Sequence, residues 1–152
     1  MAKSTQLELI RDLAQSREHG LAAEVSELRR LKTSAEVDLN RLDSYLSEYT
    51  LGMSRSNPQT GRSVTQVENE RRFVRRLNIA VEQQRIRARQ FSERVNMKIQ
   101  SWQRERAHLD ALERAVEQRR IAGRRIQERR EQTDTDTMLG HRMALKIGSA
   151  KT

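Results

Sequence analysis

Few residues of this chain have the type and spacing that enzymatic chemistry requires. The histidines His19, His108 and His141 are far apart, and none has a second histidine at the spacing of a metal-ligand pair. Because the chain has no cysteine, it can form neither a thiolate metal site nor a disulfide. No glycine-rich phosphate loop occurs, and no Ser, His and Asp set stands where it would build a pocket. We expect no catalytic residue, no cofactor and no metal, so the protein is predicted not to be an enzyme.

Arginine is the abundant residue type that could bind a ligand through its charge. The 152 residues include 30 Lys and Arg against 21 Asp and Glu, a net charge of +9. Residues 1–60 carry 8 basic and 9 acidic side chains, residues 61–131 carry 19 and 10, and the last 21 residues carry 3 and 2. The basic excess therefore belongs to the second half of the chain. Such a surface suits an acidic protein, nucleic acid or anionic lipid, and an ordinary solvated helix face explains it equally well.

Nucleic acid is not favoured as a partner. Arginine pairs at 71–72, 75–76, 119–120, 124–125 and 129–130 could follow phosphates, but acidic residues stand among them and aromatic residues make up only 3% of the chain. We expect no nucleic-acid partner, and a basic coiled-coil nucleic-acid-binding protein remains an alternative. No stretch approaches the roughly 18 to 20 apolar residues of a membrane span, and the N-terminus lacks a signal peptide's apolar core. We therefore expect a cytoplasmic protein that reaches the membrane only through a partner.

Two long helical segments flank one turn. Glycine and proline cluster between Gly52 and Gly61, around the only proline, Pro58, whereas both flanks are rich in Leu, Glu, Arg, Gln and Ala. Capping-box patterns begin at Thr5 and at Ser63. We predict a helix over 5–53, a turn over 54–62 and a helix over 63–131. The tail, 132–152, has no sustained period and is predicted to be disordered and flexible.

Apolar residues recur every seventh position in both segments, which is the signature of a coiled coil. The predicted seam is interrupted by Lys32, Gln84, Lys98 and Glu105, which cost stability and can fix the register. The fold class is therefore all-α, an antiparallel coiled-coil hairpin over 1–131 whose second helix is the longer. The seam of the first helix consists of Leu7, Ala14, Leu21, Leu28, Ala35, Leu42 and Tyr49, with Val25, Leu39, Leu46 and Met53 between them. That of the second consists of Val67, Val74, Val81, Ala88, Val95, Trp102, Leu109 and Val116, with Leu77, Phe91, Leu112 and Ile126 between them.

The predicted pairing places an aromatic patch beside the turn. Residues whose numbers sum to roughly 116 should lie side by side in the antiparallel pair, so Tyr45 and Phe73 should be neighbours. With Leu42, Tyr49, Leu77 and Ala80, they would form an apolar patch that either binds a partner or simply widens the local core. At the other end the second helix overhangs the first by roughly 20 residues, and a lone basic helix of this kind is only marginally stable in water.

Several segments follow one another in a characteristic order and spacing. They are the opening MAK with Leu7, Asp12, Leu13 and Ala14, then LDSYLSEY at 42–49, FVRRLNIAVEQQ at 73–84, Ser101 and Trp102 before basic residues, and Ala111 and Leu112 before the overhang. In this order and spacing they resemble the flagellar export protein family FliJ, and the resemblance covers about residues 1–131. The resemblance implies a non-catalytic stalk that inserts into the hexameric export ATPase ring, contacts the cytoplasmic domain of the membrane export gate and handles export chaperones. It also implies a peripheral location at the cytoplasmic face of the cell membrane, at the flagellar base. The injectisome counterpart, with the same architecture, stays open as an alternative.

The resemblance also assigns two sets of binding residues. Asp38 and Gln84 depart from the family's polar positions at the gate site, which puts their part in binding in doubt. A structural spacer without either site remains the third hypothesis. The gate-binding set is Leu42, Tyr45, Tyr49, Phe73, Leu77 and Ala80. The ATPase-ring set is Leu7, Leu13, Leu21, Trp102, Leu109, Leu112, Arg119, Arg120 and Arg124.

Overall fold

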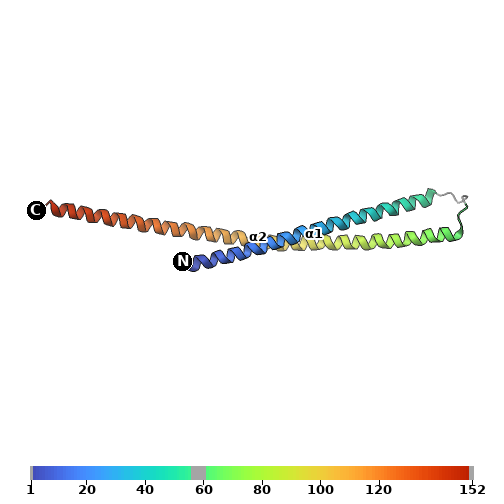
Figure 1. Cartoon of the computed structure of the whole chain (residues 1–152), viewed down its shortest axis with the longest axis horizontal. Coiled ribbons are helices and arrows are strands. Elements are labelled where there is room, and N and C mark those ends of the chain that lie inside the picture. The colour runs from blue at the N-terminus through green and yellow to red at the C-terminus, as the bar shows by residue number, and fades with distance from the viewer. Residues whose placement is uncertain (1, 56–60, 151–152) are drawn as a thin grey trace. The chain divides into compact units, whose positions relative to one another are not determined.

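Two α-helices make up almost all of the chain in the computed structural model, which describes residues 2–55 and 61–150, with side chains for 5–53 and 61–150. Helix α1 spans Ala2–Arg55, with 54 residues, and α2 spans Val64–Ser149, with 86 residues (Figure 1). No strand occurs within these ranges. The helices pack against each other, which confirms the predicted all-α helical hairpin with a longer second helix.

The chain divides into two compact units, each built from both helices. One comprises residues 17–105, on either side of the connection, and will be called the connection unit. The other joins the start of α1, up to Ser16, to α2 from Arg106 onwards, and will be called the terminal unit.

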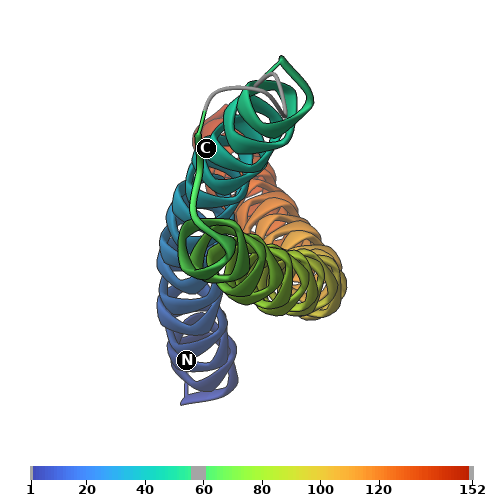
Figure 2. The same cartoon turned by 90° about the vertical axis from the view of Figure 1, so that its right-hand side faces the viewer.

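The core of the connection unit is a single seam between antiparallel helices. Its buried apolar residues are Val25, Ala35, Val81, Ala88 and Val95, all of them at predicted seam positions. Two of the polar interruptions bind across the seam: Gln84 Nε2 donates to the Ala35 carbonyl oxygen at 3.0 Å, and Lys98 Nζ lies 2.8 Å from a Glu24 carboxylate oxygen. Figure 2, viewed from the side of the connection, shows α1 and α2 leaving it as two separate helices.

The terminal unit has a much smaller core. Ala14 is 3% exposed and Leu109 is 2% exposed, and both are at predicted seam positions. Leu7, Leu112 and Val116 are half-buried beside them. Every residue of α2 from 117 to 149 is exposed. Here the helix continues with no second helix of the described chain packed against it.

The predicted register is wrong by about one helical turn. The observed partners 35 and 84, 18 and 102, and 49 and 73 have numbers that sum to 119, 120 and 122 rather than about 116. The reason lies at the connection, because α1 continues through Gly52 to Arg55 and α2 begins only at Val64. The connection is therefore centred later in the sequence than the predicted pairing assumed, and each residue of α1 meets a later residue of α2.

At the ends of the helices, one predicted capping box is confirmed and the other is wrong. At the start of α2, Ser63 Oγ accepts from the Gln66 backbone N–H at 3.2 Å, and Gln66 Oε1 accepts from the Ser63 N–H at 3.3 Å, which confirms that capping box. Helix α1 instead begins at Ala2, so Thr5 lies inside it and does not start it. Residues 56–60 of the predicted turn lie outside the described residues.

The prediction of a disordered tail is corrected for residues 132–149, which continue α2 to Ser149. The segment has no proline, and its apolar and basic residues tolerate a helix well. Its threonines are also accommodated, because the hydroxyls of Thr133, Thr135 and Thr137 donate to backbone carbonyls four residues earlier, at 2.8–2.9 Å. Residues 151 and 152 lie outside the described residues.

Candidate partner-binding surfaces

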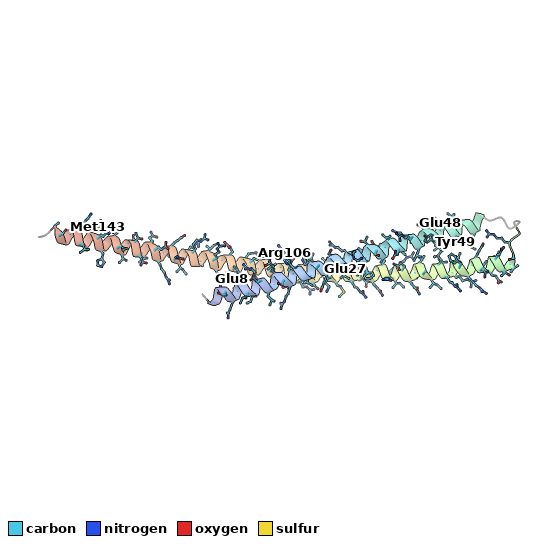
Figure 3. All side chains as sticks on the ribbon, viewed as in Figure 1. Glu8, Glu27, Glu48, Tyr49, Arg106 and Met143 are labelled. Atoms are coloured by element: carbon cyan, nitrogen blue, oxygen red, sulfur yellow. The ribbon has the colours of Figure 1, made fainter. Side chains whose placement is uncertain are left out.

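An exposed aromatic pair lies near the connection. The rings of Tyr49 and Phe73 have centroids 4.7 Å apart with their planes tilted by 48°, a favourable geometry for aromatic contact. Tyr49 is nevertheless 47% exposed and Phe73 is 44% exposed. Figure 3 shows Tyr49 on the side of α1 that faces α2. The pair thus joins the two helices on one side and leaves an aromatic surface in solvent on the other.

The other predicted members of the patch are three half-buried residues and one exposed residue. Leu42, Leu77 and Ala80 are half-buried. Tyr45 is 54% exposed, and it lines a shallow hollow on α1 with Val37, Asn40, Arg41 and Ser44. The expected pairing of Tyr45 with Phe73 is therefore wrong, because the shifted register gives that place to Tyr49.

A second hollow adjoins the aromatic pair and was missed from the sequence. Its lining consists of Glu48, Tyr49, Gly52, Met53, Arg62 and Glu70, and it is mostly apolar. Arg62 Nη1 and Glu70 Oε2 form an ion pair at 2.7 Å beside it. Arg62 and Glu70 are eight positions apart across the start of α2 at Val64, so no helical spacing rule relates them.

The predicted ATPase-ring residues on the seam are mainly core residues. Leu109 is fully buried, and Leu7, Leu21 and Leu112 are half-buried. Leu13 does reach the surface, at 55% exposed, and its neighbours Leu9 and Ile10 are 63% and 49% exposed. These two residues were not predicted, although they are apolar and stand off the heptad seam. Leu9, Ile10 and Leu13 together form an exposed apolar surface at the start of α1.

Trp102, another predicted ring residue, is tied into the core of the connection unit. Its indole Nε1–H donates to Glu18 Oε1 at 2.9 Å. Glu18 is the buried charged residue of the described core, at 6% exposed, and its Oε2 lies 3.6 Å from Nε2 of the exposed His19. Trp102 is itself half-buried, so it contributes to the packing of the helices and keeps part of its surface in solvent.

The predicted arginines of the terminal unit lie on its surface. Arg119, Arg120 and Arg124 are all exposed. Within the described chain, Arg120 and Arg124 have no ion-pair partner, and Arg120 borders a hollow with Glu8, Arg11 and Glu117 among its other lining residues. Arg120 and Arg124 therefore remain available for an acidic partner.

Glu27 and Arg30 form an ordinary surface pair. The hydrogen bond from Arg30 lowers the pKa of the Glu27 carboxyl, and the same bond raises the pKa of the Arg30 guanidinium. Both groups are in solvent, so they add little to stability. Among the described residues, no group of three or more His, Asp or Glu is arranged to hold a metal ion. No helix in the described ranges is long and apolar enough to cross a membrane.

Comparisons with known proteins find matches along almost the whole chain. A protein-family model described as "Flagellar FliJ protein" matches residues 3–146. The flagellar FliJ protein of Salmonella typhi is 31% identical over 104 residues, which cover 67% of this chain and 69% of that protein. The family match extends into residues 132–146, the part of α2 that the sequence patterns had left out of the coiled coil.

Proposed function

Because this chain belongs to the flagellar FliJ protein family and is thus a component of the flagellar protein export machinery, we propose that it acts there as a non-catalytic stalk. The terminal unit inserts into the hexameric export ATPase ring, and the connection unit contacts the cytoplasmic domain of the membrane export gate. Export chaperones are its further partners. The protein works at the cytoplasmic face of the cell membrane, at the flagellar base.

The exposed Tyr49–Phe73 pair is the observation that carries this proposal. A pair needed only for packing would be covered, yet each ring is nearly half in solvent. Aromatic side chains are the commonest anchors of protein interfaces because they bury much apolar area at a low cost in conformational entropy. Two rings that are already in contact are pre-organised, so a partner does not have to order them. This supports the connection unit as the gate-binding part.

The terminal unit has the chemistry that suits insertion into a ring. A bare helix is narrow, and residues 117–149 of α2 are exposed on all sides. Arg120 and Arg124 lack acidic partners in the described chain, and Leu9, Ile10 and Leu13 offer an apolar contact at the start of α1. A ring lined by acidic loops and an apolar collar would pair with both features.

Gate binding is tested by the double variant Tyr49→Ala/Phe73→Ala. Loss of both rings should weaken binding to the purified cytoplasmic domain of the gate by about tenfold or more, because interface aromatics commonly contribute about 2 kcal/mol each. Isothermal titration calorimetry measures the affinity, and circular dichroism checks that helicity is kept. The matched control, Met138→Ala/Met143→Ala, also removes two exposed side chains and should bind like the wild type. Wild-type affinity in the aromatic variant would refute the gate-binding patch.

Ring binding is tested with the purified export ATPase. Electron microscopy of rings mixed with the full chain should show density in the central opening, and Arg120→Glu/Arg124→Glu should reduce the occupied fraction several-fold, because opposite charges become like charges. Arg71→Glu/Arg104→Glu makes the same change in net charge on the connection unit and should leave occupancy unchanged. An equal loss in both variants would show that net charge alone drives the association. Empty rings with the wild-type chain would refute the stalk.

A further inference from the structure

The outward face of α2 in the connection unit carries apolar residues that the hairpin does not use. Ile79 and Ile86 are 58% and 46% exposed. Each stands two residues before a buried seam residue, Val81 or Ala88, and two residues turn a helix by about 200°. The isoleucines therefore point away from α1. Met97 lies on the same outward side, eighteen residues or about five turns after Ile79, and is 70% exposed.

The spacing along this face is that of a second coiled-coil seam, which we name the outward seam. Its positions are separated alternately by four and three residues, the spacing at which a helix offers a stripe to a partner helix. From Ile79 to Gln90 these positions carry no charge, although 34% of the chain is charged and the outermost positions of a two-helix coil are normally charged. The outward seam consists of Ile79, Gln83, Ile86 and Gln90, and Arg72 and Arg76 stand at the two preceding positions of the same spacing.

The rim of the outward seam is positively charged. Arg72, Arg75, Arg76 and Arg89 are exposed, and none has an ion-pair partner in the described chain. The acidic residues on this side are Glu68, Glu82 and Glu93, and Glu82 already binds Arg85 at 3.1 Å. The four arginines therefore outnumber the two acidic side chains that remain, and their charges are not satisfied within the hairpin.

We propose that the outward seam binds an acidic amphipathic helix of a partner protein, which packs along α2 as a third helix. Ile79 and Ile86 supply the apolar contacts, the two glutamines fit a helix seam without burying a charge, and the arginines pair with flanking carboxylates of the partner. This surface is distinct from the aromatic patch, since Leu77 is two residues from Ile79 and lies on the opposite side of α2. It does not depend on the gate-binding or ring-binding roles.

A designed peptide provides the probe for this surface. The peptide is a fluorescein-labelled 21-residue helix with leucine at the seam positions of its heptads and glutamate beside them, and repulsion between the glutamates keeps it monomeric. Fluorescence anisotropy with the full-length chain at low salt should show saturable binding at micromolar concentrations of the chain. Ile79→Ser/Ile86→Ser should weaken that binding by about tenfold or more, because both apolar contacts are lost. Added salt should weaken it as well, since the rim contacts are electrostatic.

Three controls test whether an acidic helix is the molecule that binds the outward seam. Val37→Ser/Ile121→Ser changes two other exposed aliphatic residues and should bind the peptide like the wild type. A peptide with lysine in place of every glutamate should not bind. Sedimentation velocity on the chain alone should give the same species for the wild type and the Ile79→Ser/Ile86→Ser variant. The proposal is overturned if the acidic peptide does not bind the wild type, if both peptides bind equally, if the outward-seam variant binds undiminished, or if that variant abolishes a dimer of this chain.

Discussion

Replacing Leu109 by alanine is expected to lower the free energy of unfolding of the terminal unit by about 2–4 kcal/mol. Leu109 is 2% exposed and is the one fully buried large side chain of the described residues. Beside it only Ala14 is buried in this unit, so the alanine substitution removes most of the apolar contact that holds α1 to α2 there. A helix end that loses its partner is only marginally stable in water. The start of α1 should therefore open while the connection unit stays paired.

Hydrogen exchange measures this opening segment by segment. Amides of residues 5–16 should exchange faster in Leu109→Ala by the factor that corresponds to the lost stability, whereas amides of residues 81–95 should keep their protection. Leu145→Ala is the matched control, because Leu145 is 72% exposed on the same helix and its truncation should change exchange very little. Equal protection of residues 5–16 in Leu109→Ala and the wild type would contradict the role given to Leu109.

The sequence was sufficient to find the core because the core of a two-helix coil is a single line. Val25, Ala35, Val81 and Val95 are buried, and the heptad repeat alone had picked them out. A residue in such a line is buried or exposed according to its angle around the helix, and the angle follows from its number. The same logic found the capping box at Ser63, since capping depends on residues only three apart.

The register between the two helices could not be predicted from the sequence, because it depends on where the helices end at the connection. Gly52 costs a helix only about 1 kcal/mol, which is too little to end it, and α1 continues to Arg55. This extension moves every partner by about one turn and decides whether Tyr45 or Tyr49 meets Phe73. A patch that combines residues from two helices cannot be assigned until that register is known.

The predicted binding residues also show that heptad position alone does not distinguish buried core residues from residues at a binding surface. Leu109, which was predicted to bind the ATPase ring, is 2% exposed, and Trp102, another residue of that set, is half-buried with its indole N–H bonded to Glu18. Leu9 and Ile10 are off the seam and reach solvent, and apolar residues off the seam were the available signal for them. Glu18 occupies a seam position seven residues before Val25, and its partner Trp102 could be recognised only after the register was known.

The second large effect is expected at the buried pair of Glu18 and Trp102. Trp102→Phe keeps an aromatic ring in the seam but removes the N–H that donates to Glu18 Oε1 at 2.9 Å. Because the Glu18 carboxylate is 6% exposed, water cannot readily replace the lost donor, and stability should fall by about 1–3 kcal/mol. His19 compensates little, since its Nε2 is 3.6 Å from Glu18 Oε2 and its side chain is 71% exposed. Urea denaturation followed by circular dichroism measures the change.

A second substitution separates the loss of the hydrogen bond from a packing defect. In the Trp102→Phe background, Glu18→Leu removes the carboxylate that has lost its indole donor, so the double variant should recover most of the lost stability. If Trp102→Phe costs the same whether Glu18 is present or has been replaced by leucine, the indole N–H contributes nothing and packing accounts for the effect.

The Trp102→Phe/Glu18→Leu double variant should also show what the buried pair of Trp102 and Glu18 contributes beyond stability. An apolar seam tolerates a shift of one heptad, whereas a single buried donor–acceptor pair is satisfied in one register. Ala35 and Gln84 are in contact across the seam, so Ala35→Cys/Gln84→Cys reports the register through cross-linking. Oxidation should give one disulfide-linked product when Trp102 and Glu18 are present, and a reduced yield when both have been replaced by apolar residues. An equal yield in the two backgrounds would show that the apolar residues of the seam set the register without the buried pair.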